Sequence, residues 1–301
     1  MNRERNHRGG DGSCIVARPP GRFTSQDGLS LWYKVSGSGP VLLVPTPGWG
    51  PSSDTHMMTL TRLERDYTLI YFDTRGAGRS DVPPKPSGYA FDLFLSDLEA
   101  LREHLGVDQW RIFAHSAASL QAMGYAIKYP ARCGGLFIVD GETNIEDEEY
   151  KKDLKARMKK LSRKPWYAAA IRTYNHNPKS DDDFRRDFLG DSMPLYFASR
   201  SAALKARPYF RASTYHIKAF TYNDMADEFP PATLAKISAP TAIFVGEQDV
   251  ITTPFDAARL NCGIKNSMLF TIKSAGHFSW VEQPTAFFKD FDQAAKKIFQ
   301  G

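Results

Sequence analysis

Three short segments of the sequence each carry a side chain that is typical of nucleophilic catalysis. Ser116 lies within Ala-His-Ser-Ala-Ala, Asp249 ends Gly-Glu-Gln-Asp, and His277 lies within Gly-His-Phe. A serine hydroxyl attacks a carbonyl carbon effectively when a histidine accepts its proton and a carboxylate orients that histidine. Serine, acid, histidine is one of the chain orders in which such triads occur. We therefore predict that Ser116 is a nucleophile, His277 its base and Asp249 the orienting acid.

The surroundings of Ser116 predict a sharp turn between a strand and a helix. Residues 110–113 are mostly apolar and favour a strand, and apolar residues recur at helical spacing over 118–129. Such a strained turn needs small residues two positions before and after the nucleophile, and Ala114 and Ala118 stand there. Glycine is more usual at both positions, so the turn is expected to be slightly wider. The alternative is that Ser116 only caps an ordinary core helix.

Apolar runs that favour strands also precede the acid and the base. Residues 242–245 lead to Asp249 and residues 268–272 lead to His277. Both side chains therefore fall at the carboxyl ends of strands, where open α/β sheets keep their sites. The alternatives are a helix-capping role for Asp249 and a surface role for His277. Asp140, at the end of another strand, is a rival for the role of the acid.

Strand and helix patterns alternate along the chain, which predicts a mostly parallel sheet with helices on both faces. Asp27-Gly28 is a strong hairpin signal between the first two of eight expected strands. The expected strands are 23–25, 29–35, 41–45, 68–73, 110–115, 135–140, 240–246 and 267–272. The expected helices of the sheet layer are 91–105, 118–129, 253–262 and 284–299.

The chain divides into three expected parts. Residues 1–20 are rich in Gly, Arg and Pro and are predicted to be disordered. Residues 21–141 and 237–301 form the α/β core. Residues 142–236, called the cap segment below, show helical periodicity and clusters of aromatic residues without a comparable strand run. We expect this segment to be a helical lid over the core.

Composition and charge indicate a soluble globular protein. The chain has 301 residues, of which 42% are hydrophobic and 24% charged. The net charge of +5 is spread out, apart from a basic stretch over 151–164 whose spacing predicts an amphipathic helix with a solvated face. We therefore expect a small-molecule substrate and neither a nucleic-acid nor a membrane partner. The oligomeric state is not specified by the sequence.

Cysteine usage and the N-terminus indicate a reducing compartment. Cys14, Cys133 and Cys262 are too few and too scattered for a disulfide framework or a metal site. We expect no metal and no other cofactor. No apolar signal segment and no run of about 18 apolar residues occurs. The expected location is the cytoplasm.

The sequence resembles the α/β-hydrolase superfamily over about residues 22–300, and within it the proline iminopeptidases and related fungal-type hydrolases. The triad segments carry the resemblance, together with two others. Residues 44–50, Val-Pro-Thr-Pro-Gly-Trp-Gly, stand where that branch has His-Gly-Gly-Pro-Gly-Gly, and residues 73–80 read Asp-Thr-Arg-Gly-Ala-Gly-Arg-Ser. The resemblance implies an α/β-hydrolase fold with a helical cap inserted after the sixth strand.

The resemblance also implies an oxyanion hole made of backbone N–H groups. In that branch a residue after the third strand donates one of them, and alignment without a gap places Thr46 there. Pro45 and Pro47 have no N–H, so Thr46 is the nearest donor. Ala117, directly after the nucleophile, supplies the second donor.

Together these features predict hydrolysis through an acyl-enzyme. The substrate is a small organic ester, lactone, thioester or amide, and Trp49, His115 and Trp280 are expected to contact it. A serine nucleophile argues against the epoxide-hydrolase and haloalkane-dehalogenase members of the fold, which need a carboxylate at that position. Proline iminopeptidases hold a free amine with acidic cap residues, and acidic residues over 142–149 could do so here. The same residues could instead complement a helix dipole.

Two other classes of function stay open. One is non-hydrolytic catalysis on this fold, such as carbon–carbon bond cleavage, cyclisation or lyase chemistry on a natural product. The unusual sequence of segment 45–47, in the expected oxyanion loop, is the reason to consider it. The other is a binding protein that retains the pocket and clasps a ligand with the lid.

Overall fold

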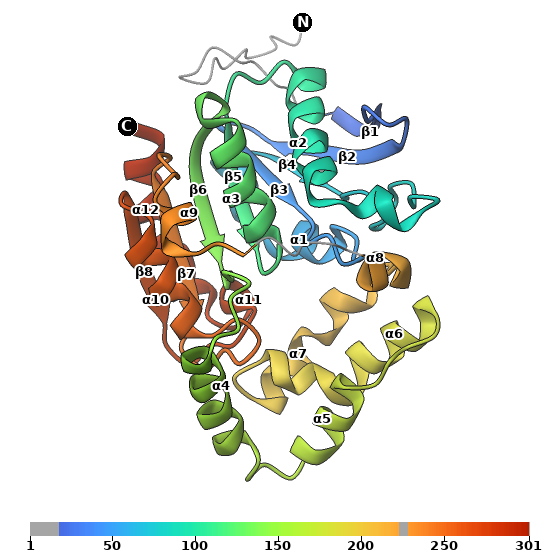
Figure 1. The fold of residues 1–301 in the computed structure, drawn as a ribbon, viewed down its shortest axis with the longest axis vertical. Helices are drawn as coiled ribbons and strands as arrows, with labels where there is room; N and C mark the ends of the chain where they lie inside the picture. The colour runs from blue at the N-terminus through green and yellow to red at the C-terminus, as the bar shows by residue number, and fades with distance from the viewer. Residues whose placement is uncertain (1–17, 223–227, 301) are drawn as a thin grey trace, which may run out of the picture.

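The computed structural model describes residues 18–222 and 228–300 of the chain. An eight-stranded sheet runs through its centre in the order β1-β2-β4-β3-β5-β6-β7-β8 (Figure 1). β2 pairs antiparallel with β1 and with β4, and the other neighbours are parallel. The predicted mostly parallel sheet is therefore confirmed. The strands are β1 (Arg18–Thr24), β2 (Ser30–Gly37), β3 (Val41–Pro45), β4 (Thr68–Phe72), β5 (Trp110–His115), β6 (Cys133–Val139), β7 (Thr241–Gly246) and β8 (Ser267–Ile272).

The predicted hairpin joins β1 to β2. Phe23 pairs with Leu31 across it, and Gly28 adopts a φ of 91°, a region that glycine reaches without steric cost. β1 begins at Arg18 rather than at the expected residue 23, because its pairing with β2 starts there.

The expected disordered tail, 1–20, falls almost wholly outside the described residues. Residues 1–17 are not described, and residues 18–20 belong to β1. The expectation for 18–20 is therefore corrected, since the backbone there belongs to the sheet.

Helices cover both faces of the sheet. Successive side chains of a strand point to opposite faces, so Ile112 packs in one apolar cluster with α2, α3 and α10, while Phe113 packs in the other with α12. Both faces are buried, which explains why the central strands are largely apolar. The helices of the core are α1 (Asp54–Thr59), α2 (Phe91–Leu105), α3 (Ala118–Lys128), α10 (Pro254–Gly263), α11 (Ser279–Glu282) and α12 (Pro284–Gln300).

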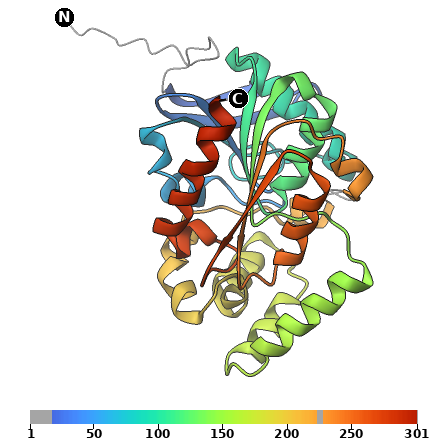
Figure 2. The ribbon, with the colours of Figure 1, turned by 90° about the vertical axis from the view of Figure 1, so that its left-hand side faces the viewer.

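The cap segment forms helices and loops between β6 and β7, with no strand among its described residues. Figures 1 and 2 show α4 to α7 gathered at the end of the sheet where the parallel strands have their carboxyl ends. Phe188, Phe210 and Tyr215 of this segment join the apolar cluster that contains Val44 and Phe113 of the sheet. The helices are α4 (Glu148–Leu161), α5 (Tyr167–Tyr174), α6 (Asp181–Asp187), α7 (Arg200–Arg211), α8 (Ile217–Tyr222) and α9 (Pro231–Leu234).

The helix predicted from the basic stretch is α4, and none of its side chains is fully buried. Across the described ranges, no helix combines the length and the apolar character needed to cross a membrane.

Candidate active site

Ser116 occupies the sharp turn between β5 and α3 that the sequence predicts. Its φ is 56°, a left-handed conformation that is strained for a residue other than glycine. The Ser116 N–H donates to the carbonyl oxygen of Val139 at 3.0 Å, and Ala114 and Ala118 are fully buried on either side. The turn is thus held by the sheet and packed with small side chains, and it places the hydroxyl at the carboxyl end of β5.

The three predicted triad residues lie in one hydrogen-bonded row. His277 Nε2 is 2.9 Å from Ser116 Oγ, and His277 Nδ1 is 2.8 Å from Asp249 Oδ2. Because a carboxylate can only accept, Nδ1 carries the proton and Nε2 presents its lone pair to the serine hydroxyl. This tautomer is the one in which a histidine can accept the serine proton.

The acid is fixed by its own loop. Asp249 Oδ1 accepts from the N–H groups of Ile251 and Thr252 at 2.8 and 3.3 Å, and Oδ2 accepts from the Thr252 hydroxyl at 3.0 Å. Burial alone would lower the pKa of His277, but the charge of Asp249 and its hydrogen bond raise that pKa above its ordinary value. Asp249 therefore stabilises the imidazolium that forms when His277 accepts the serine proton. Sequence reasoning missed Thr252, although it stands only three positions after the acid.

Asp140, the rival acid, has a different set of partners. Its Oδ1 accepts from the Gly246 N–H at 2.8 Å, and its Oδ2 accepts from the N–H and hydroxyl of Ser279 at 3.1 and 2.8 Å. Burial, and then the charge of Asp249, raises the pKa of Asp140. Asp140 therefore joins the end of β7, which leads to the acid, to the turn that carries the base. The signal for Ser279 in the sequence is its place two residues after His277.

The two predicted oxyanion donors differ in availability. The Ala117 N–H, at the start of α3, has no hydrogen-bond partner in the described part of the chain. The Thr46 N–H instead donates to the Phe72 carbonyl oxygen at 2.9 Å, because the ladder between β3 and β4 continues one residue past Pro45. Its hydroxyl is paired with that of Thr74 at 2.8 Å. The expectation that the Thr46 N–H is an oxyanion donor is therefore corrected, since this N–H is hydrogen-bonded within the sheet.

Residues 73–80 support the segment that follows β3. Asp73 accepts from the Ser53 N–H at 2.7 Å and from the N–H and guanidinium of Arg79 at 2.9 and 2.7 Å. Gly78 has a φ of 52°, and a Cβ there would lie 2.3 Å from Asp73 Oδ2. This motif thus has a structural role, which is to hold the loop after β3 against the core.

The three residues expected to contact substrate occupy different places. Trp49 and His115 line a small cavity that Phe278, the residue after His277, also lines, and Trp49 stacks on Tyr215 with ring centroids 6.4 Å apart. Trp280 is 1% exposed, and its indole N–H donates to the Thr59 hydroxyl at 3.0 Å. Trp280 is not among the residues that line this cavity. It is a core residue that supports the ring of His115, with centroids 4.7 Å apart.

The acidic residues at the start of the cap segment separate into two roles. Asp147 caps α4 by accepting from the Tyr150 N–H at 2.9 Å, as the helix-dipole alternative expects. Glu142 has its charge close enough to His277 for the two to interact. Burial, and then the charge of Asp256, raises the pKa of Glu142 to about 7, while His277 acts in the opposite direction.

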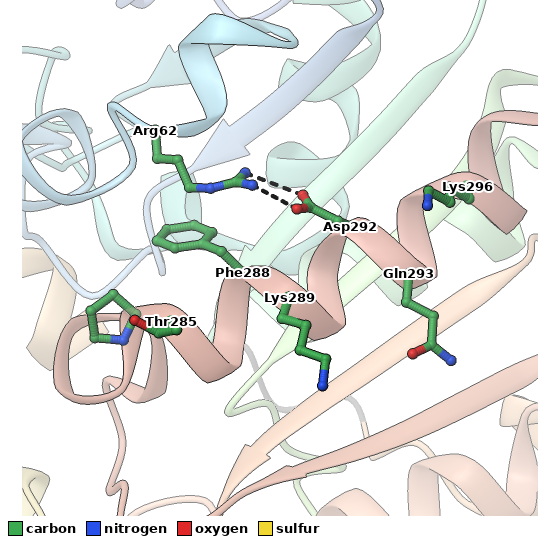
Figure 3. Close-up of a pocket in the computed structure, with 8 residues that line it drawn as sticks. Arg62, Thr285, Phe288, Lys289, Asp292, Gln293 and Lys296 are labelled. Carbon is green, nitrogen blue, oxygen red and sulfur yellow. Dashed lines mark hydrogen bonds and ion pairs between the residues drawn. The ribbon is translucent and has the colours of Figure 1, made fainter.

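A wide surface groove lies away from the triad. It has a volume of about 860 Å³, and Figure 3 shows it along α12, where Arg62 pairs with Asp292 through two contacts of 3.1 and 2.6 Å. None of the predicted site residues lines it. Within the described ranges, no three His, Cys, Asp or Glu side chains converge in a way that could hold a metal ion.

Comparison with known proteins agrees with this architecture. A family model described as alpha/beta hydrolase fold matches residues 40–284. The proline iminopeptidase of Saccharolobus solfataricus is 27% identical over 90% of this chain and 91% of its own length. The proline iminopeptidase PfmaB of Pestalotiopsis fici is 26% identical over 87% of this chain and 94% of its own.

Solved structures show the same fold. An esterase from Exiguobacterium antarcticum superposes with a TM-score of 0.70 at 18% identity, over 91% of this chain and 98% of that one. A proline iminopeptidase-related protein from Thermus thermophilus gives a TM-score of 0.69 at 21% identity, over 95% of this chain and 99% of that one.

Because Asp249 and Asp140 have different hydrogen-bond partners, replacing each carboxylate should have a different effect on turnover. D249N should lower turnover of 4-nitrophenyl acetate on the order of 10⁴-fold, because the amide no longer fixes the histidine tautomer. D140N removes a group that contacts the two loops but not the imidazole, so its loss should be much smaller, about tenfold. Steady-state kinetics of both variants decides between them. Near-normal turnover in D249N would show that the acid is misassigned.

The raised pKa of Glu142 predicts that the stability of the fold depends on pH. Its ordinary pKa of 4.5 is raised to about 7 in the fold, so between these values the folded chain holds a proton that the unfolded chain releases. The free energy of unfolding should therefore fall as pH rises from about 4.5 to 7. E142Q should reduce that fall, and E148Q, at an exposed site on α4, should not. Urea unfolding at pH 5 and pH 8 measures the difference, and an equal fall in E142Q and the parent protein would contradict it.

Proposed function

The chain belongs to the α/β-hydrolase fold family and is a hydrolase, and from this premise we propose that it is a serine hydrolase acting through an acyl-enzyme. The proposed substrate is a small organic ester, lactone, thioester or amide. The observation that carries the proposal is the hydrogen-bonded row of Ser116, His277 and Asp249, in which the imidazole bridges hydroxyl and carboxylate at 2.9 and 2.8 Å.

The proposed reaction begins with attack of Ser116 Oγ on the substrate carbonyl carbon. His277 Nε2 accepts the hydroxyl proton as the bond forms, and Asp249 stabilises the resulting imidazolium. The same proton then passes from Nε2 to the leaving group. Water, deprotonated by His277, attacks the acyl-enzyme and returns the serine to its starting state.

In the proposed reaction, the negative charge on the tetrahedral intermediate develops next to the N-terminal end of α3. The Ala117 N–H has no partner in the described chain, and the N-terminal end of a helix carries a partial positive charge. Because the Thr46 N–H is bound to the sheet, we propose that Ala117 is the principal donor of the oxyanion hole.

Two features bear on the bond that is cleaved. Relatives named proline iminopeptidase favour an amide next to a free amine, and the carboxyl of Glu142, whose charge interacts with that of His277, is suited to such an amine. Structural neighbours named esterase favour an ester. The chemistry at Ser116 is the same for both. We propose action without a metal or other cofactor, and the cytoplasmic location remains a prediction.

A covalent probe tests the nucleophile directly. A fluorophosphonate should label the parent protein on Ser116 and should not label S116A, because the probe reacts with a serine whose proton is removed by an adjacent base. S119A is the matched control, since Ser119 is also buried and lies close by on α3, and this variant should still be labelled. Intact-protein mass spectrometry followed by peptide mapping reads the adduct. Labelling that persists in S116A would discard the proposal.

A further inference from the structure

The hydroxyl of Thr252 lies within hydrogen-bond distance of three groups at once. Its Oγ1 atom is 2.7 Å from the carbonyl oxygen of Asp140, 3.0 Å from Asp249 Oδ2 and 3.1 Å from His277 Nδ1. Thr252 is 2% exposed, and it belongs to the loop between β7 and α10. This buried side chain therefore contacts both the acid and the base of the triad.

The chemistry of the three groups decides how the hydroxyl bonds to them. A hydroxyl has one proton to donate and two lone pairs that accept. The carbonyl of Asp140 and the carboxylate of Asp249 can only accept, so the proton goes to one of these two oxygens at a time. Nδ1 of His277 carries a proton in the tautomer that its contact with Asp249 fixes. Whichever oxygen receives the Thr252 proton, a lone pair of Oγ1 remains to accept from Nδ1–H.

Nδ1 of His277 therefore faces two acceptors, Asp249 Oδ2 at 2.8 Å and Thr252 Oγ1 at 3.1 Å. In the opposite tautomer, a bare Nδ1 would face the carboxylate oxygen. Thr252 could then donate to this nitrogen only by withdrawing its proton from the other two oxygens. Because the site is buried, such a loss of hydrogen bonds is costly. The hydroxyl thus favours the same tautomer as the acid does.

The carbonyl oxygen that binds Thr252 belongs to a strained turn at the end of β6. Asp140 has a φ of 46°, in the left-handed region that residues other than glycine rarely adopt. Its N–H donates to the Phe244 carbonyl at 2.8 Å, and its carboxylate is held by Gly246 and Ser279. Strain of this kind persists where the surrounding contacts hold it, and it clusters at functional sites. Thr252 is therefore anchored to a fixed part of the sheet.

We propose that Thr252 is a positioning residue of the triad, whose hydroxyl holds the imidazole of His277 in the orientation and tautomer that catalysis requires. Ser116 is bonded to the other nitrogen of the ring, so Thr252 acts through His277 and not on the substrate. The inference rests on the proposed serine hydrolase function and adds a fourth side chain to its machinery.

The next residue in the chain offers a matched comparison. Thr253 is also buried, but its hydroxyl caps α10 by accepting from the Phe255 N–H at 3.2 Å. Among the hydrogen bonds of the described ranges, none joins the Thr253 side chain to the acid or to the base. Replacement of either threonine by valine removes one buried hydroxyl and retains the branched shape of the side chain. The two variants therefore differ in whether the lost hydroxyl contacts the triad.

Steady-state kinetics with 4-nitrophenyl acetate tests the inference. T252V should lower kcat about tenfold. KM should stay nearly unchanged, because His277 serves both the formation and the hydrolysis of the acyl-enzyme. T252S, which keeps a hydroxyl, should retain most of kcat. T253V should keep the parent kcat, although the loss of a helix cap lowers its stability. Circular dichroism shows that each variant is folded at the temperature of the assay.

A spectroscopic measurement separates positioning from a general loss of stability. The nuclear magnetic resonance signal of the proton on His277 Nδ1 should shift in T252V, because this proton loses one of its two acceptors. The same signal should stay at its parent position in T253V. If T252V does not fold, T252A, which also lacks the hydroxyl, takes its place with the same expected results.

A parent-like kcat and an unshifted signal in T252V would overturn the inference. So would equal losses of kcat in T252V and T253V, or a T252S variant no more active than T252V. Absence of fluorophosphonate labelling of Ser116 in the parent protein would instead refute the proposed function. A labelled parent protein with an unaffected T252V refutes only the role of Thr252, so the two failures are distinguishable.

Discussion

The structure depends on one imidazole being held between a hydroxyl and a carboxylate in a site that excludes water. His277 is 2% exposed and Asp249 is fully buried, so their interaction is little screened by solvent. Three loops that are distant in sequence must meet for it to form. The parallel sheet achieves this, since β5, β7 and β8 all present their carboxyl ends to the same edge.

Around this row, a second set of polar groups fixes the loops rather than the substrate. Asp140 binds the end of β7 and the turn of the base at once. Glu282 does the same between the turn of the base and the cap segment, accepting from the N–H groups of Gly276 and Ala198 at 2.6 and 2.8 Å. The His277 N–H also donates to the Tyr196 carbonyl at 2.9 Å. The cap segment is thus hydrogen-bonded directly to the turn that carries the base.

Much of the fold and of the triad could be predicted from the sequence, because hydrophobic periodicity and turn chemistry depend on residues that are close together in the chain. The eight strands, the hairpin and the helices α2, α3, α10 and α12 follow from them, and so does the elbow at Ser116, whereas the short helices α1 and α11 were not predicted. The availability of the Thr46 N–H could not be predicted, because it depends on how far the β3–β4 ladder extends. The place of Trp280 in the core could not be predicted either, since it depends on packing between segments far apart in the chain.

The account is tested most directly by the protonation of His277 itself. In protein with ¹⁵N-labelled histidine, at a pH well above the raised pKa of His277 so that the imidazole is neutral, nuclear magnetic resonance should show the His277 proton on Nδ1 and a bare Nε2. Phosphonylation of Ser116 should change the Nε2 resonance. A proton on Nε2, or a His277 spectrum unaffected by modification of the serine, would contradict the central claim that this imidazole links the two side chains.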